Sequence, residues 1–158
     1  MRGERGGKVA RMRPRTFFAA TATVFALALA LAGATGPATA QSPAQDWVVN
    51  NPRAVVVHRT TGMCLTGTGG AGSPVTTQGC RNAPGQQFVA EGGEIYQRTA
   101  DLCLTAAASG GPATLRRCDG SAGQRFGVQG ATIRQADGDR CLTATGAGRP
   151  VVLTRCTA

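Results

Sequence analysis

The chain has 158 residues, of which 42% are hydrophobic, 4% aromatic and 16% charged, and its formal net charge is +9. This length allows one domain with a targeting segment and excludes a large multidomain enzyme. The 23 glycines and 8 prolines disfavour long helices, because both residues destabilise a helix interior.

The N-terminus has the pattern of a secretory signal peptide. Residues 1–15 are rich in arginine, residues 17–33 are uncharged and mainly apolar, and a small-residue A-x-A site ends at Ala40. A basic region, a short apolar run and such a site are typical of a removable export signal. We therefore predict that residues 1–40 are removed and that residues 41–158 form one secreted, extracellular domain without a membrane segment.

Removal of the signal peptide lowers the net charge. Residues 41–158 contain 11 arginines and no lysine against 7 acidic residues, which gives a formal net charge of +4. The arginines are dispersed along the sequence, whereas nucleic-acid recognition requires a clustered basic surface. We therefore expect no nucleic-acid partner.

A threefold repeat organises residues 41–158. The tripeptide Cys-Leu-Thr recurs in steps of 39 and 38 residues, and a second cysteine follows each copy in steps of 38. Before each second cysteine, apolar residues alternate with their neighbours at a period of two, as in half-buried strands. Glycine-rich stretches between these segments predict turns. The six cysteines are Cys64, Cys80, Cys103, Cys118, Cys141 and Cys156.

An even number of cysteines in a small exported domain indicates disulfide bonds, here three. Threefold symmetry leaves two patterns open. The pairs lie either within repeats, as in Cys64–Cys80, or between repeats, as in Cys80–Cys103. We expect no metal site, because the sequence has no Cys-x-x-Cys motif and His58 is its only histidine.

A second signature, Gln-x-aromatic, opens each repeat. The aromatic residues would supply one large apolar side chain per repeat to a shared core. The glutamine amide offers donors and an acceptor to backbone groups left unpaired at turns. We therefore expect structural roles for both residues. The motifs contain Gln45 and Trp47, Gln86 and Phe88, and Gln124 and Phe126, and the repeats cover about 45–85, 86–123 and 124–158.

Similar all-β repeats with these motifs resemble the ricin B-type lectin family. The resemblance rests on Cys-Leu, on an apolar-x-apolar-x-x-Cys strand and on Gln-x-aromatic, and it covers residues 41–158. It implies a β-trefoil, an all-β fold whose strands form a short barrel capped by hairpins. It also favours disulfides within repeats, which would be Cys64–Cys80, Cys103–Cys118 and Cys141–Cys156.

The phase of the repeats departs from the family pattern. The family usually ends on Gln-x-Trp, whereas this chain has its tryptophan motif, from Gln45 to Trp47, at the start of the domain. The termini of a trefoil meet. We therefore expect residues 45–49 to supply the strand that would otherwise close the C-terminus, as in a permuted trefoil.

No set of residues predicts catalysis. His58 occupies the repeat position of Gln97 and Gln135, which indicates a structural role. Asp137 and Asp139 flank a glycine, a pattern typical of a turn. The sequence offers no nucleophile with a base and no metal-ligand set. We therefore expect a protein that is not an enzyme and needs no cofactor.

The resemblance also implies where a sugar would bind. Sugar-binding members carry an aspartate after Cys-Leu and an aromatic residue two positions before the second cysteine, and this chain has neither. Gly85, Gly123 and Ala44 replace the asparagine that precedes the Gln-x-Trp motif. The residues at the first two positions, which are our candidate ligand residues, are Thr66, Gln78, Thr105, Arg116, Thr143 and Thr154.

These replacements predict a secreted carbohydrate-binding protein with altered, weak sugar pockets, because the charge-assisted hydrogen bonds and the stacking ring are both lost. Weak sites in several repeats gain avidity on a repeating polysaccharide. The alternative is a non-lectin trefoil that binds a protein partner through loops such as 106–112 or 81–85. In both cases we expect a monomer.

Overall fold

A computed structural model describes residues 42–157 of the chain except residue 109. The predicted signal peptide, residues 1–40, lies outside the described residues. Among the described residues, no helix has the length and hydrophobicity needed to cross a bilayer. These residues form twelve β-strands and four short 3-10 helices.

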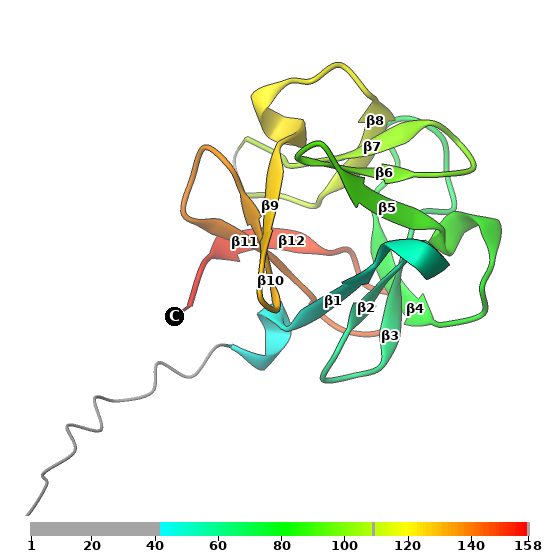
Figure 1. Cartoon of the computed structure of the whole chain (residues 1–158). Coiled ribbons are helices and arrows are strands. Elements are labelled where there is room, and N and C mark those ends of the chain that lie inside the picture. The colour runs from blue at the N-terminus through cyan, green and yellow to red at the C-terminus, as the bar shows by residue number, and fades with distance from the viewer. Residues whose placement is uncertain (1–41, 109, 158) are drawn as a thin grey trace, which may run out of the picture. The chain divides into compact units, whose positions relative to one another are not determined.

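The described strands form three antiparallel sheets, each made of four strands that are consecutive in the sequence (Figure 1). In the first sheet, β1 pairs with β2, β2 with β3 and β3 with β4. The strands are β1 Trp47–Asn50, β2 Val55–His58, β3 Met63–Thr66, β4 Thr76–Gly79, β5 Phe88–Glu91, β6 Glu94–Gln97, β7 Leu102–Thr105, β8 Thr114–Arg117, β9 Phe126–Gln129, β10 Thr132–Gln135, β11 Arg140–Thr143 and β12 Val152–Arg155. The 3-10 helices are η1 Pro43–Gln45, η2 Asn51–Arg53, η3 Pro84–Gln86 and η4 Ala122–Gln124.

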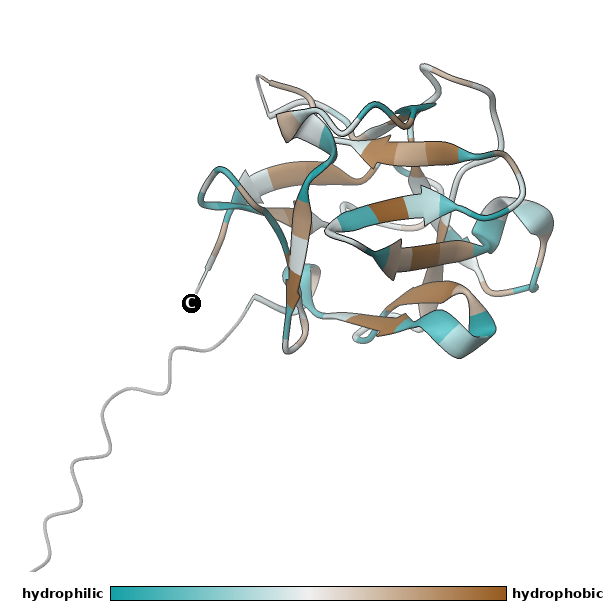
Figure 2. Cartoon of the chain, turned by 45° about the horizontal axis from the view of Figure 1, so that its top comes forward, coloured by the Kyte–Doolittle hydropathy of each residue, from teal (hydrophilic) through white to brown (hydrophobic). Residues whose placement is uncertain are grey.

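Each short strand follows from an alternation of inward and outward side chains. In β2, Val56 is buried while Val55 and Val57 are only half-buried. The equivalent central residues of the other repeats, Ile95 and Ile133, are buried as well. Successive side chains of a strand point to opposite faces of the sheet, so one face of each sheet enters the core. Figure 2 shows the hydrophobic residues concentrated in the strands.

The core consists of equivalent residues from the three repeats. The three Gln-x-aromatic rings are buried, with exposed fractions of 0–4%. The leucines of the Cys-Leu-Thr motifs pack in the same cluster. Each repeat therefore contributes one ring and one leucine to a shared centre. These residues are Trp47, Phe88 and Phe126, and Leu65, Leu104 and Leu142.

Backbone hydrogen bonds join the three sheets into a closed arrangement. Val75 donates to Ala113 at 2.9 Å, Ala113 donates to Val151 at 2.8 Å, and Val151 donates back to Val75 at 2.8 Å. This ring links the segments that lead into β4, β8 and β12. Three four-stranded repeats that are joined in a closed ring are the architecture of a β-trefoil. This arrangement confirms the predicted fold class.

A second set of hydrogen bonds joins each repeat to a neighbour at its first strand. The backbone amides of the three core aromatic residues each donate at 2.7 Å to the repeat that precedes them in the circle. Because Trp47 donates to Ala131, the first repeat is bonded to the third. The other two donors and acceptors are Phe88 to Ala54 and Phe126 to Gly93.

The disulfides lie within the repeats. Their sulfur atoms are joined across 16, 15 and 15 residues of sequence, and no described cysteine is free. This confirms the pairing that the family resemblance favours and excludes the alternative between repeats. The three pairs are Cys64–Cys80, Cys103–Cys118 and Cys141–Cys156.

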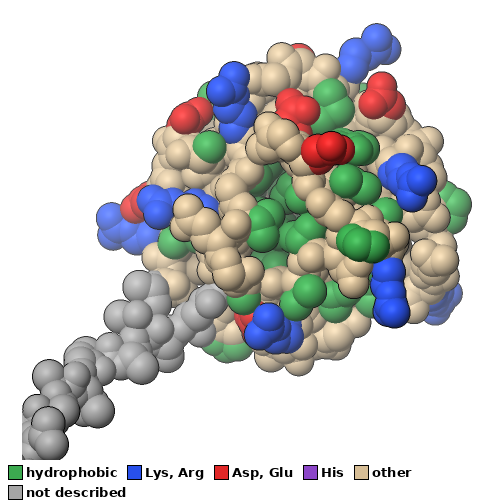
Figure 3. Space-filling model, viewed as in Figure 1, with side chains coloured by type: hydrophobic (Ala, Val, Ile, Leu, Met, Phe, Trp, Pro, Cys, Tyr) green, Lys and Arg blue, Asp and Glu red, His purple; other side chains and the backbone are tan. Residues whose placement is uncertain are grey.

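The charged side chains are spread around the described domain. On the face drawn in Figure 3, arginines lie mainly around the edge, acidic side chains stand among several of them, and hydrophobic atoms occupy the centre. Only two ion pairs occur in the described part of the chain, Arg59 with Asp46 and Arg155 with Asp139. The cations on this face therefore do not merge into one continuous basic surface.

Candidate functional site

The predicted ligand residues lie on the outward face of the third and fourth strands of each repeat. In the first repeat, Cys64 pairs with Gln78 across the hairpin, and Thr66 pairs with Thr76. Opposed residues of an antiparallel pair point to the same side, so Thr66 and Gln78 share the face that carries the disulfide. The same register recurs in the other repeats, where Cys103 pairs with Arg116 and Cys141 with Thr154.

Thr66 is buried, and its hydroxyl has two partners. It donates to the carbonyl oxygen of Cys64 at 3.0 Å and accepts from Nε2 of Gln86 at 3.0 Å. The Gln86 amide also donates to the carbonyl oxygen of Gly79 at 2.9 Å and accepts from the backbone amide of Arg81 at 2.8 Å. A hydroxyl that is buried and already donates its proton has little to offer to a ligand.

The second repeat contains the same network. Thr105 is buried, donates to the carbonyl oxygen of Cys103 at 3.1 Å and accepts from Nε2 of Gln124 at 3.2 Å. The Gln124 amide also bonds the backbone at Arg117 and Asp119, both at 2.8 Å. The glutamine of Gln-x-aromatic thus satisfies turn backbone, as predicted, and it also covers the threonine that we assigned to a ligand.

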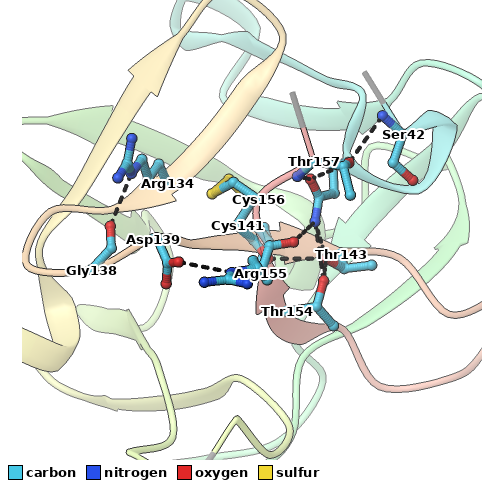
Figure 4. Close-up of a disulfide and its surroundings, with 12 residues drawn as sticks. Ser42, Arg134, Gly138, Asp139, Cys141, Thr143, Thr154, Arg155, Cys156 and Thr157 are labelled. Atoms are coloured by element: carbon cyan, nitrogen blue, oxygen red, sulfur yellow. Dashed lines mark hydrogen bonds and ion pairs between the residues drawn. A yellow bond between two sulfur atoms is a disulfide. The ribbon is translucent and has the colours of Figure 1, made fainter. Parts of the chain in front are cut away.

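The third repeat is completed by Gln45, a residue from the other end of the domain, which contacts Thr143 and Thr157. Figure 4 labels these two threonines. Nε2 of Gln45 lies 3.1 Å from the hydroxyl of Thr143 and 2.9 Å from the carbonyl oxygen of Arg155. Its Oε1 accepts from the backbone amide of Thr157 at 3.0 Å. Gln45 therefore makes the contacts to the third repeat that Gln86 makes to the first. The permuted phase remains a prediction, and these contacts favour it.

The third repeat also brings two candidate ligand residues into direct contact. The hydroxyls of Thr143 and Thr154 are 2.7 Å apart, and Thr154 also lies 3.0 Å from Nε2 of Gln45. Thr143 is half-buried and Thr154 is exposed. In the other repeats, Gln78 and Arg116 are exposed, and neither has a hydrogen bond to the candidate threonine of its repeat, Thr66 or Thr105; Gln78 instead donates to the hydroxyl of Thr76 at 3.3 Å. Of the three candidate pairs, only Thr143 and Thr154 therefore form a joined polar group.

Gly85 marks a close approach of two backbone segments beside Thr66. The amide of Gly67 donates to the carbonyl oxygen of Gly85 at 2.8 Å. A Cβ atom added at Gly85 would lie 2.6 Å from the carbonyl oxygen of Gly67, whereas one added at Gly123 would lie 3.4 Å from that of Ala106. The asparagine of sugar-binding relatives therefore does not fit at Gly85 unless the backbone moves.

We expect Gly85→Ala to lower the free energy of unfolding by about 1–3 kcal/mol, because the added methyl group overpacks against a backbone atom. Gly123→Ala is the matched control, with an expected loss under about 1 kcal/mol, because a small adjustment relieves its contact. Urea unfolding followed by tryptophan fluorescence measures both values. Equal losses in the two variants would contradict the closer approach at Gly85.

The residues that we assigned to structural rather than catalytic roles have structural partners. His58 is buried, with Nδ1 2.8 Å from the hydroxyl of Thr61 and Nε2 2.8 Å from the carbonyl oxygen of Pro43. Asp139 accepts a hydrogen bond from Nε of Arg155 at 3.1 Å, and this bond lowers the pKa of the Asp139 carboxyl. Within the described residues, no group of three His, Cys, Asp or Glu side chains is placed to hold a metal ion.

Sequence reasoning assigned no role to the outward side chains of the second strand in each repeat. In β2 these are Val55 and Val57, which line a groove beside the Cys64–Cys80 disulfide. The signal was present in the sequence, because β2 carries valines at outward as well as inward positions. Most outward strand positions carry polar side chains that face water. Apolar side chains at such positions indicate a binding surface instead.

Comparisons with known proteins agree with this fold. Residues 91–158 match the family model of the ricin-type beta-trefoil lectin domain. No curated protein sequence matches the chain. Among solved structures, the chain resembles the β-trefoil lectin of the Vibrio vulnificus hemolysin/cytolysin, solved with N-acetyl-D-lactosamine bound. The two are 26% identical, the match covers 59% of this chain and 76% of that one, and the TM-score is 0.51.

The chain is also similar in fold to the hemolytic lectin CEL-III. The identity is 22%, the TM-score is 0.53, and the match covers 73% of this chain but only 29% of that one. The chain thus spans less than a third of the CEL-III chain. The family model covers the second repeat from residue 91 and the whole third repeat, and the first repeat has the same sheet, disulfide and Gln–Thr contact. Residues 91–158 of the chain are thus similar to the ricin-type beta-trefoil lectin domain, and the solved structures share its fold.

Proposed function

We propose that this protein is a secreted carbohydrate-binding protein whose sugar pockets are altered and weak. The observation that carries the proposal is the ricin-type lectin domain itself, with a polar side chain exposed at the same outward position of every repeat. These side chains belong to Gln78, Arg116 and Thr154. They offer hydrogen bonds to sugar hydroxyls without a stacking ring. Such contacts are weak singly and gain strength on a repeating polysaccharide.

Thr143 and Thr154 form the best candidate for a sugar contact among the positions of the family pocket. Their joined hydroxyls are partly accessible, and the Gln45 amide holds them in place. Thr66 and Thr105 are the weaker candidates, because a glutamine covers each of them. We propose that these two threonines act on the ligand only through the position of their neighbours.

Export to an oxidising compartment forms part of the proposal. Three disulfides in one small domain support it, since such bonds persist mainly outside the cytosol. The basic and apolar pattern of residues 1–40 supports it independently. We propose cleavage after Ala40 and a monomeric extracellular product.

A non-lectin interaction scaffold is the second candidate function. It is favoured by the burial of Thr66 and Thr105, which removes two of the candidate sugar contacts. In that case a protein partner would bind through loops such as 81–85 and 106–112, and binding would not respond to free sugar. Fold alone does not decide between the two functions.

A glycan panel tests the proposal directly. The full chain is expressed in an exporting host, and the oxidised protein from the medium is applied to glycans and insoluble polysaccharides. We expect binding that a soluble saccharide competes, and an affinity about tenfold lower when Gln78, Arg116 and Thr154 are all replaced by alanine. Arg98→Ala, at an exposed turn residue, is the control and should bind as the unmodified protein does.

Two outcomes would overturn the lectin proposal. One is a folded, disulfide-paired protein that binds no glycan of the panel. The other is binding that free sugar does not compete, which would instead support the interaction scaffold.

A further inference from the structure

The first repeat has a groove of about 560 Å³ beside its disulfide. Its floor is formed by Val55, Val57 and the Cys64–Cys80 bridge, and Arg53, Arg81 and Asn82 line it as well. Val57 lies opposite Cys64 in the β2–β3 pairing, so the floor continues the outward face that carries the disulfide. The groove therefore combines an apolar floor with two cations and an amide.

Hydrogen bonds fix the backbone of both arginines. Asn50 caps η2 by accepting from the backbone amide of Arg53 at 3.2 Å, and Oε1 of Gln86 accepts from the backbone amide of Arg81 at 2.8 Å. In the described part of the chain, neither guanidinium group has a hydrogen bond or an ion pair. The backbone of both arginines is thus fixed beside the groove, and their guanidinium groups remain available to a ligand.

The surroundings of the groove contain no competing carboxylate from the same stretch of chain. No acidic residue occurs between Trp47 and Ala90. The acidic residue that precedes this stretch, Asp46, lies 3.5 Å from Arg59. Among the described residues, neither groove arginine is therefore paired with a carboxylate.

The equivalent positions of the second repeat have the opposite charge. Tyr96 takes the place of Val57, since it pairs with Cys103 as Val57 pairs with Cys64. Glu94, two residues before Tyr96, takes the place of Val55, and Asp119 follows the second cysteine as Arg81 does. An anion that suits the first repeat would meet carboxylates at these positions.

The equivalent positions of the third repeat carry both positive and negative charge. Its groove, of about 370 Å³, is lined by Arg134 and by the carboxylate residue Asp139. Nε of Arg134 already donates to the carbonyl oxygen of Gly138 at 2.9 Å, and Asp139 is paired with Arg155 (Figure 4). Of the three equivalent positions, only that of the first repeat combines unpaired cations with an uncharged floor.

We infer that the groove beside Cys64–Cys80 binds an acidic saccharide, a sugar ring that bears a carboxylate or a sulfate. This inference rests on the proposed carbohydrate-binding function and names the class of sugar. Guanidinium groups bind carboxylates and sulfates through paired, charge-assisted hydrogen bonds. The two valines offer an apolar surface to the CH face of the ring, and the Asn82 amide offers hydrogen bonds to its hydroxyls.

Binding to an acidic and to a neutral polysaccharide tests the inference. Polygalacturonate supplies carboxylates and dextran is neutral, and both are titrated with the oxidised full chain from an exporting host at one low ionic strength, because salt screens exposed charges. We expect polygalacturonate to bind and the double variant Arg53→Gln/Arg81→Gln to lose about tenfold in affinity. The control Arg98→Gln/Arg149→Gln removes the same charge elsewhere and should lose less than about twofold.

The outcomes separate this inference from the proposed function. Binding of dextran or other neutral glycans without polygalacturonate would overturn the acidic class and leave the lectin proposal standing. Binding of no saccharide would overturn both. Equal losses in the two double variants would show that net charge, and not the groove, attracts the polymer. Free galacturonate and inorganic sulfate are then compared as competitors of polygalacturonate. If sulfate competes at the same concentration as galacturonate, the groove is an anion site that does not recognise the sugar ring.

Discussion

Replacement of Trp47 by alanine should lower the free energy of unfolding by about 3–5 kcal/mol, the cost of deleting a buried aromatic side chain. Trp47 is 1% exposed, its Nε1 donates to the carbonyl oxygen of Leu142 at 2.8 Å, and its ring lies edge-on to His58 at 5.0 Å between centroids. Because Leu142 belongs to β11, the substitution removes a contact between the first and third repeats. Urea unfolding followed by far-UV circular dichroism measures the loss, because this variant lacks the chain's only tryptophan.

Two further variants make the Trp47 result interpretable. Trp47→Phe places at this position the residue that the other two repeats carry, so its loss of about 1–3 kcal/mol should reflect mainly the missing indole hydrogen bond. Val128→Ala truncates a side chain that is 44% exposed and should change stability by less than about 0.5 kcal/mol. An unchanged stability of Trp47→Ala would contradict the proposal that the N-terminal strand closes the third repeat.

The fold was predictable from the sequence because repetition makes weak local signals add. Each strand has only four residues, and one strand alone indicates little. Aligned copies, however, place Val56, Ile95 and Ile133 at one buried position. The disulfide pattern needed the family resemblance, because the spacing of the cysteines fits two symmetric arrangements equally well.

The structure places two candidate sugar residues, Thr66 and Gln78, on one face of the β3–β4 hairpin. The family resemblance named these two positions. It could not show that Gln86, 20 residues after Thr66, folds back over its hydroxyl. That contact depends on the path of the chain after the second cysteine, where η3 turns the glutamine toward the hairpin. Glutamine was expected to bind backbone, and the additional threonine contact became visible only in three dimensions.

The groove of the first repeat is not predictable from the repeat pattern, for a different reason. The period-two pattern identifies the buried positions and carries no information about the outward valines of β2. Their meaning depends on Arg53 and Arg81, which are 28 residues apart in the sequence and line one groove. A sequence pattern taken one repeat at a time does not join such residues.

Two disulfides of equal loop length should differ in what they contribute to stability. Cys103–Cys118 and Cys141–Cys156 both close 15 residues, so the unfolded-state entropy term is about 3 kcal/mol for each. We expect Cys103→Ser/Cys118→Ser to lose about this amount. We expect Cys141→Ser/Cys156→Ser to lose about 1 kcal/mol more, the net worth of one further hydrogen bond.

The larger loss expected for Cys141→Ser/Cys156→Ser follows from which glutamine contacts each repeat. In the second repeat, Gln124 bonds the amide of Asp119, only five residues away, so the local chain keeps the two together. In the third repeat, Gln45 bonds the amide of Thr157, and 112 residues separate them. Bringing distant residues together costs more entropy, so the contact depends on Cys156 holding Thr157 in place. Urea unfolding of both variants measures the difference, and equal losses would show that Gln45 holds the third repeat without help from the disulfide.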